Sequence, residues 1–512
     1  MKTKLFHIIL LSIIVTSASG QGAFDALNYS QTYNGGTARF VSMGGAFGAL
    51  GGDFSSLSYN PAGLGVYRSS EFTITPSFKS RKIASDYNGS SGDDTRNRMY
   101  FDNLGFVLSF KPYKDNESGL VGFNLGFGYN RTNDYYSNSY AVGENPETSI
   151  MDYFAAQANG YNSDDMSYPL DPNDTYDPYY ALGSGAWEAI MAWNTYLINP
   201  DVDPNTYVAA LNAGDGVLQR KWVSTTGSTG EYAFSAGLNF SNKLFLGATF
   251  GISSLNYSTS SKYWEDAFNT NDSLNNGYRF YYSDYRQTVE TKGAGYNLKI
   301  GAIYKPIEGL RLGLALHTPT FYNLEDTYSY SLYANFDQHQ QEYGLTENTP
   351  NARFDYSLET PFKVIGSVAY VFKDFGLLTL DIEHVNYSTM KLRDGSDGYD
   401  FPTENADIKD AFKDVYNIRL GGEARIDKVF LRAGYAYYPS PYNSEYLNKG
   451  ANRTIISGGI GYRSGNFFVD AAYQHSMQKD KYVFYDAGGY TTNPISTKTT
   501  EGKVLVTVGF KF

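Results

Sequence analysis

The feature that most constrains the fold of this chain is the alternation of apolar residues with small or polar residues over many short segments. In the clearest example, segment 121–129, the apolar positions are Val121, Phe123, Leu125, Phe127 and Tyr129. Similar segments follow at 232–240, 244–252, 298–304, 310–316, 416–424, 429–437, 456–462 and 504–512. Because successive side chains of a strand point to opposite faces, each segment predicts a β-strand with one apolar face.

The connections between these segments are alternately short and long. Short turns lie at 112–119, 241–243, 305–309, 373–376, 425–428 and 463–466, and long polar connections lie near 85–98, 136–217, 259–277, 335–351, 391–411, 439–450 and 477–499. This pattern joins about fourteen strands, an even number, as in bacterial outer-membrane barrels. A soluble β-sandwich gives no reason for the alternation of loop lengths. We therefore expect an all-β, antiparallel transmembrane barrel with both chain ends on the periplasmic side.

The composition agrees with a barrel that crosses a membrane with strands. Mean hydropathy is -0.40, yet the chain holds 48 Tyr and 33 Phe. Only every second strand residue faces lipid, and aromatic residues form girdles at the two membrane surfaces. The net charge of -12 argues against a nucleic-acid partner. The chain has no cysteine, and the acidic loop 163–177 lacks the glycine and closing glutamate of an EF-hand, so we expect no metal site and no cofactor.

The two ends of the chain suggest where the protein resides. Lys2 and Lys4 precede an apolar run, and the small residues Ala18 and Gly20 follow it, so residues 1–20 are predicted to be a cleaved signal peptide. The alternating segment 504–512 is expected to close the barrel by pairing with the first strand, which begins near Glu71. These features predict the outer membrane of a Gram-negative-type bacterium.

Residues 21–70 precede the predicted barrel of residues 71–512 and are too apolar to form a solvated tail. Since the lumen of a barrel this size is wide enough to hold a plug, we expect this segment to fold inward as a hatch. Its large apolar side chains Phe40, Phe47, Phe54 and Leu57 are candidates for contact with an apolar ligand.

The hatch carries the motif Asn60-Pro61-Ala62, which resembles the plug motif of the FadL/TodX family. Segments 311–324, 360–370 and 381–388 also resemble that family's barrel strands. The resemblance implies passive uptake of hydrophobic compounds such as long-chain fatty acids, by capture, hatch rearrangement and lateral or periplasmic release. The partners it implies are hydrophobic small molecules, outer-membrane lipid and lipopolysaccharide, and the barrel-assembly machinery.

The insertion at 136–217 departs from the family pattern. It is expected to form a partly helical extracellular cap, with helices near 149–158, 186–197 and 205–213. A long loop in a compact protein is usually functional. The alternative function is therefore a non-transporting receptor, adhesin or structural barrel that acts through this cap.

Two pairs of residues are candidate features of the barrel wall and lumen. Pro319 and Pro361 lie at similar heights on adjacent predicted strands, and neither can donate a ladder hydrogen bond, so we expect a wall distortion there. Lys299 and Arg419 occupy the lumen-facing set of their strands and are candidates for binding a carboxylate in the lumen. The plainer interpretation is that they pair with acidic side chains of the lumen. No enzyme activity is expected, because His384 faces away from Asp381 and Glu383 in an extended strand.

Overall fold

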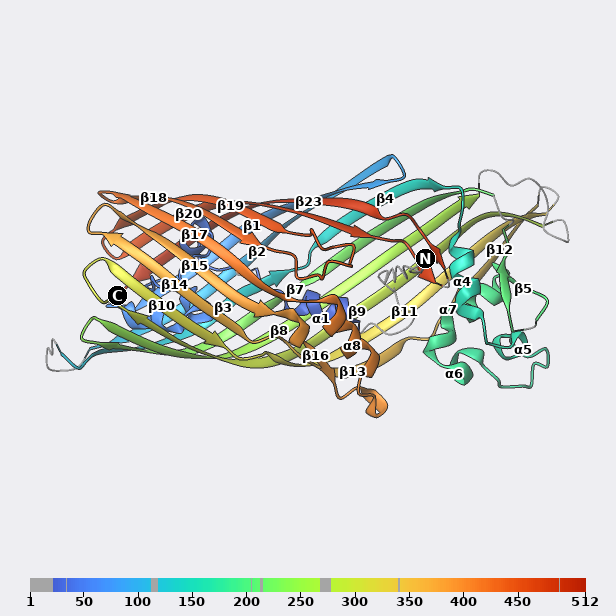
Figure 1. The fold of residues 1–512 in the computed structure, drawn as a ribbon, viewed down its shortest axis with the longest axis horizontal. Coiled ribbons are helices and arrows are strands. Elements are labelled where there is room, and N and C mark those ends of the chain that lie inside the picture. The colour runs from blue at the N-terminus through green and yellow to red at the C-terminus, as the bar shows by residue number, and fades with distance from the viewer. Residues whose placement is uncertain are drawn as a thin grey trace, which may run out of the picture.

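The computed structural model describes residues 22–33, 35–111, 118–203, 205–211, 215–267, 278–338, 341–487 and 489–512. The predicted signal peptide at residues 1–20 lies outside these ranges. The described chain forms a closed antiparallel barrel of 14 strands with helices inside and above it (Figure 1). The predicted fold class is therefore confirmed.

Some of the fourteen wall strands are interrupted, so each of these carries two labels. In wall order the strands are β1 (Glu71–Tyr87), β2 (Ser90–Phe110), β3 (Leu120–Asp134) with β4 (Ser137–Asn145), β7 (Val217–Phe240), β8 (Leu244–Ala267), β9 (Tyr278–Tyr304), β10 (Leu310–His317) with β11 (Phe321–Gln338), β14 (Lys363–Phe372) with β13 (Ala352–Glu359), β15 (Gly376–Asn386) with β16 (Lys391–Arg393), β17 (Asp414–Ile426), β18 (Val429–Tyr438), β19 (Arg453–Ser464), β20 (Phe467–Tyr482) and β23 (Ile495–Lys511).

The last strand closes the barrel against the first, as the sequence predicts. Strand β23 pairs with β1 from Glu71 opposite Lys511 to Asp86 opposite Ser496. Along β23 the apolar positions predicted from the alternation, Val504, Val506, Val508 and Phe510, are all exposed on the outer face. An exposed apolar band of this kind is what a barrel presents to lipid.

Most of the long connections are shorter than the sequence suggests, because the strands continue above the membrane. Strands β1 and β2 are joined by a turn at only Asn88 and Gly89, not by a loop at 85–98. Strand β8 likewise continues to Ala267, and β11 forms a hairpin with β12 (Gln341–Asn348) where the sequence predicts loops. Beyond the bilayer neither face of a strand has to be apolar, so the ladder persists while the alternation disappears.

The hatch fills the periplasmic part of the lumen. It contains α1 (Ala23–Ser30), α2 (Ala38–Ser42), α3 (Ser56–Tyr59) and the 3-10 helix η1 (Pro61–Val66). Its apolar residues join those of the wall in shared clusters, for example Leu50 and Tyr59 with Ala315 and Ile365. Helix α1 lies apart from the other hatch helices, farther from the end of the barrel where the chain ends (Figure 1). It packs against the loop helix α8 (Pro402–Ala411).

The cap above the barrel is partly helical. Its elements are α4 (Ile150–Ala158), α5 (Ser163–Met166), α6 (Pro178–Leu182), η2 (Ser184–Ala186), α7 (Trp187–Asn194), β5 (Ile198–Pro200) and β6 (Tyr207–Ala209). The helices predicted near 149–158 and 186–197 correspond to α4 and α7. The helix predicted at 205–213 is wrong over its described residues, because Tyr207 and Val208, which favour strands, pair with β5 instead.

The remaining elements belong to the outer loops. They are η3 (Tyr387–Thr389), η4 (Ser396–Gly398), β21 (Asp486–Ala487) and β22 (Tyr490–Thr491). Among the described residues, no helix is both long and apolar enough to cross a membrane.

Closure between β1 and β23 can be tested with a disulfide, because the native chain has no cysteine. Ile74 lies directly opposite Val508. The pair Ile74→Cys/Val508→Cys is expected to form a disulfide on mild oxidation, since opposite residues of an antiparallel pair have the required spacing. The control pair Ile74→Cys/Val504→Cys, four residues out of register, is expected to remain reduced. Disulfide formation is measured as a change in the mass of the oxidised protein. A disulfide in both pairs, or in neither, would contradict this closure.

Candidate functional site

The hatch is held by a set of lumen-facing glycines that we call the glycine ring. Its members share one property: a Cβ added to any of them would collide with hatch atoms. They are Gly105, Gly126, Gly128, Gly237, Gly247, Gly301, Gly313, Gly421, Gly434 and Gly459. A glycine inside a strand often marks a place where another backbone approaches closely. Here the hatch backbone approaches Gly237, Gly247, Gly313, Gly421 and Gly434, and hatch side chains occupy the space at the other five.

The motif Asn60-Pro61-Ala62 lies at the centre of this contact. The Asn60 side-chain amide donates to the Gly48 carbonyl at 2.5 Å, and its oxygen accepts from the Ala62 backbone at 3.1 Å. Pro61 occupies the first turn of η1, where a proline costs no hydrogen bond. Opposite the motif, Gly301 and Gly247 leave room for Asn60 and for the Pro61 carbonyl. The motif therefore ties two hatch segments together at the wall.

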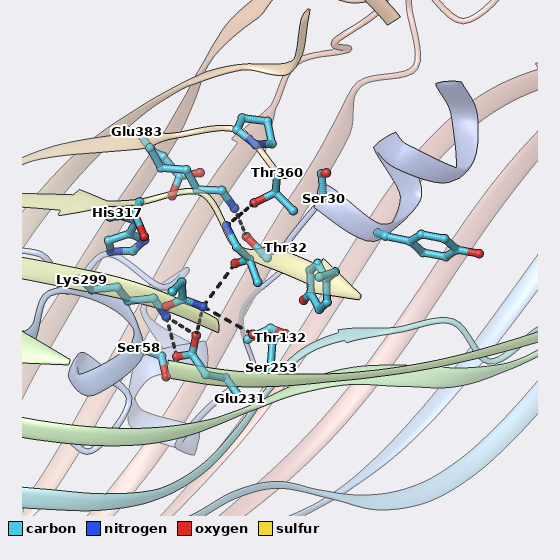
Figure 2. Close-up of a pocket in the computed structure, with 17 residues that line it drawn as sticks. Ser30, Thr32, Ser58, Thr132, Glu231, Ser253, Lys299, His317, Thr360 and Glu383 are labelled. Carbon is cyan, nitrogen blue, oxygen red and sulfur yellow. Dashed lines mark hydrogen bonds and ion pairs between the residues drawn. The ribbon is translucent and has the colours of Figure 1, made fainter. Parts of the chain in front are cut away.

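The four apolar candidates of the hatch are all buried between the hatch and the wall. Phe40 packs against Phe47, with ring centroids 5.5 Å apart, and Phe54 and Leu57 fill the space left by Gly105, Gly126 and Gly128. Phe40, Phe47, Phe54 and Leu57 each expose at most 2% of their surface. In the described structure these side chains do not line the lumen cavity shown in Figure 2.

A layer of buried charges lies above the hatch. The Lys299 ammonium pairs with Glu231, and the Arg419 guanidinium pairs with Glu383 at 3.0 Å. Both cations thus face the lumen and are held by carboxylates of other wall strands. Glu383 lies on β15, next to the β17 strand of Arg419, and Glu231 lies on β7, two strands from the β9 strand of Lys299. A polar cavity of about 50 Å³ lies in this layer, lined by Lys299 and Glu383 together with Lys363 (Figure 2).

The ladder between β10–β11 and β13–β14 is interrupted at the two prolines. His317 opposite Lys363 is the last pair below the interruption, and Phe321 opposite Glu359 is the first pair above it. The register continues through the gap, so Pro319 and Pro361 lie directly opposite each other. Pro361 lines the polar cavity. We refer to this interruption as the proline notch.

The wall is also parted between β2 and β3. Their ladder runs from Phe110 opposite Phe123 to Asn103 opposite Asn130 and ends there. Above this point a short hatch segment, residues 31–33 and 35, pairs with the free edge of β3, and we call it the leader. The Tyr33 amide donates to the Thr132 carbonyl at 3.0 Å, and the Gly35 amide donates to the Arg131 carbonyl at 2.9 Å.

An outer groove of about 690 Å³ and an inner cavity of about 30 Å³ meet at this parting. Tyr100 and Arg131 line both, so they separate the lumen from the outer surface. Met99, Phe101 and Leu104 give the groove an apolar floor on the lipid side. In the described part of the chain, one terminal nitrogen of Arg98 and one of Arg131 has no hydrogen-bond acceptor.

The cap closes the outer end of the lumen. Phe154 and Trp187 of the cap helices belong to one buried cluster with lumen-facing tyrosines of the wall, among them Tyr263 and Tyr285. The Phe154 ring lies 5.4 Å from that of Tyr285. The cap and the hatch cover the two ends of the lumen. Between them, the proline notch and the parting of β2 from β3 are places where the described wall lacks ladder hydrogen bonds.

Sequence reasoning missed the glycine ring, the leader and the arginines of the groove. Gly301 and Gly313 fall on lumen-facing positions of predicted strands, and such glycines signal close backbone approach. Arg98 and Arg131 gave no signal, because their strand segments lie where the apolar alternation ends. Their significance depends on the parting of β2 from β3, which only the three-dimensional register reveals.

Comparison with known proteins identifies relatives of this barrel. A sequence model of the family described as outer membrane protein transport protein (OMPP1/FadL/TodX) matches residues 212–512, more than half of the chain. The search of curated proteins found no match.

Solved structures of low sequence identity share the fold. A Pseudomonas aeruginosa FadL homologue superimposes with a TM-score of 0.53 at 14% identity, covering 94% of this chain and 100% of that one. The Pseudomonas putida toluene transporter TodX gives a TM-score of 0.50 at 12% identity, covering 94% and 100% of the two chains.

The contact between Gly301 and Asn60 predicts that Gly301→Ala destabilises the barrel with its hatch. The added methyl group has no space, and overpacking of this kind costs roughly 1–3 kcal/mol. The measurement is the free energy of unfolding in denaturant. Gly366→Ala is the matched control, because Gly366 faces open space on the neighbouring surface of β14. Equal stability of the two variants would show that Gly301 does not seat the hatch.

Helix α1 provides a prediction on pH. Burial raises the pKa of Asp25 from 3.8 to about 6, although the Gly22 amide partly offsets this. A raised carboxyl pKa means that the docked state binds the proton more tightly, so docking is strongest below pH 4 and weakens as the pH rises through 6. Hydrogen exchange of residues 22–33, corrected for intrinsic rates, is expected to be faster at pH 8 than at pH 5. Asp25→Asn should abolish this difference; the same profile in both proteins would contradict it.

Proposed function

Because the chain belongs to the outer membrane protein transport protein (OMPP1/FadL/TodX) family, we propose that it is a passive channel for hydrophobic compounds. The compound is captured at the outer surface, moves past a rearranged hatch leader, and is released through the wall. The protein is an outer-membrane barrel, and its family is one of transport channels rather than enzymes.

The observation that carries this proposal is the position of the leader at the parting of β2 from β3. Among the described residues, the leader covers the edge of β3 with two backbone hydrogen bonds, from Tyr33 and Gly35. The apolar groove lies directly outside, and it shares Tyr100 and Arg131 with the inner cavity. Moving the leader, together with the Tyr100 and Arg131 side chains that separate the two spaces, would therefore join the lumen to the lipid phase without breaking any pair of the β3–β7 ladder.

The chemistry of the groove supports a substrate with an anionic group and a hydrocarbon part, such as a long-chain fatty acid. Two guanidinium groups, of Arg98 and Arg131, each keep one nitrogen without an acceptor among the residues that the structure describes. A carboxylate is the acceptor that a guanidinium binds best. Beside them, Met99 and Leu104 offer an apolar surface. Toluene, the compound for which the transporter TodX is named, is a hydrocarbon without any group that these arginines could bind.

The energy for capture comes from the hydrocarbon part of the substrate. Each CH₂ moved from water to an apolar surface gains about 0.8 kcal/mol. Since capture is favourable by itself, net uptake requires only that the compound be consumed on the far side. A passive mechanism therefore needs no energy-coupling partner.

The arginine groove yields a prediction about selectivity. Arg98→Met keeps the length of the side chain but removes its charge. Uptake of labelled oleate is expected to fall about ten-fold, equivalent to about 1.4 kcal/mol, while uptake of labelled toluene stays within two-fold. The measurement compares cells that carry the native chain, the variant or an empty vector, in a host without another transporter of this family.

Arg425→Met is the control, because Arg425 is an exposed residue at the periplasmic end of β17, on a strand that does not line the groove. It is expected to leave both uptake rates unchanged. Oleate and toluene uptake equal to that of the empty vector would remove the transport proposal for these compounds. An equal loss of both probes in Arg98→Met would remove only the assignment of an anionic substrate.

A further inference from the structure

The proline notch is wider than the two prolines alone would require. Strand β15 is also interrupted at this height, because η3 separates it from β16. Lys363 pairs with Val385 below the gap and Glu359 pairs with Lys391 above it. The three residues 360–362 between β13 and β14 therefore face the five residues 386–390 between Val385 of β15 and Lys391 of β16. Three adjacent wall strands thus lose their ladder at the same level.

The notch is sealed in part by threonine hydroxyls instead of backbone carbonyls. Across the notch, the Thr320 amide donates to the Thr360 hydroxyl at 2.8 Å. On the side of β9, the Leu298 amide donates to the Thr318 hydroxyl at 2.9 Å, and the Thr318 amide donates to the Leu298 carbonyl at 2.9 Å. The one backbone bond that remains between the two proline strands here, among the described residues, runs from the Thr360 amide to the Thr320 carbonyl, at 3.1 Å. A hydroxyl can rotate away from its donor while the strands stay in place, so this seal is easier to open than a ladder.

The notch lies at the outer edge of the lipid band. Phe321, the first paired residue above it, faces Tyr296 across the ladder, with rings 5.7 Å apart and 40% and 55% of their surfaces exposed. Paired exposed aromatic residues mark the girdle at a membrane surface. Strand β10 rises only eight residues from its periplasmic turn to the notch, about 20 Å for a tilted strand. The head of an amphiphile in the outer leaflet sits at this height.

Behind the notch lies a cation that is held by the hatch leader. The Lys363 ammonium donates to the Thr32 hydroxyl at 2.8 Å, and Lys363 is only 9% exposed. Among the described residues no carboxylate lies within ion-pair distance of it, unlike Lys299 and Arg419 in the same layer. Figure 2 shows Thr32 of the leader next to Thr360 of the wall. The cavity between them is lined by the three threonines of the seal.

We propose that the proline notch is a second lateral opening, through which an amphiphile with one anionic head passes between the outer leaflet and the lumen. The head moves past the threonines to Lys363, and the tail remains among the outward-facing Phe321 and Phe362 until the leader moves. The hydrogen bond from Lys363 to Thr32 latches the leader in the closed state. The inference rests on the proposed transport function and adds a route to it.

A disulfide clamp across the notch tests the route. Thr320 and Thr360 lie opposite each other in register, so Thr320→Cys/Thr360→Cys is expected to form a disulfide in the cysteine-free chain. The control pair Asn323→Cys/Ser357→Cys joins the same two strands above the notch, where the ladder is continuous. Oleate uptake is expected to fall at least five-fold in the oxidised notch pair and to recover on reduction. The oxidised control pair should stay within two-fold of the native chain.

Unchanged uptake in a fully oxidised notch pair would overturn the second opening while the transport function stands, provided that uptake by the native chain exceeds uptake with the empty vector.

A second measurement does not depend on transport. In purified protein in lipid vesicles, Thr360→Cys is labelled with a maleimide that carries an alkyl chain and partitions into the bilayer. Adding Lys363→Met, which removes the latch, is expected to raise the labelling rate at least five-fold.

Adding Lys373→Met instead is the matched control, because Lys373 lies in the exposed turn at the other end of β14. It is expected to leave the labelling rate unchanged. Equal labelling rates with Lys363→Met and Lys373→Met would overturn the latch, whatever the uptake assay gives. Labelling that rises only with Lys363→Met, in a chain that does not transport oleate, would support the opening and reject the proposed substrate.

Discussion

The close contact between the hatch and the barrel wall is the constraint on which the rest of the structure depends. Gly301, Gly313 and Gly434 of the wall carry no side chain. Asn60, Gly48 and Gly44 of the hatch therefore contact these strands directly. A protein interior packed in this way has little free volume and resists small displacements. The hatch from α2 to η1 is therefore a fixed floor, and any passage has to use the parts that are held less firmly.

The barrel is predictable from the sequence because lipid imposes a rule on every strand. Val504, Val506 and Val508 are apolar on alternate positions since each faces the bilayer. Above the membrane the rule ends, and the sequence therefore predicts loops where β1, β2 and β8 continue as strands. The site is less accessible to prediction. Alternation indicates that Lys299 and Arg419 face the lumen, but their partners Glu231 and Glu383 lie on other strands, and only the register identifies them.

The hatch candidates illustrate why a motif is easier to recognise than its physical role. Because Phe40, Phe47, Phe54 and Leu57 are large and apolar, the sequence suggests that they contact a ligand. In the structure Phe54 and Leu57 fill the space that the glycine ring leaves, and Phe40 and Phe47 pack in a buried cluster with wall residues such as Ala315 and Ile365. Nothing in a linear sequence distinguishes an apolar residue that packs against a glycine from one that faces a cavity.

The leader connects the two interruptions of the wall through neighbouring residues. Thr32 accepts from Lys363 at the proline notch, and Tyr33 donates to Thr132 at the parting of β2 from β3. Because Thr32 uses its side-chain hydroxyl and Tyr33 uses its backbone amide, two adjacent residues reach two different parts of the wall. A displacement of the leader then releases both contacts in the same step. Two openings that share one latch open together, which suits a passive channel, since its flux follows the concentration gradient and needs no alternation of access.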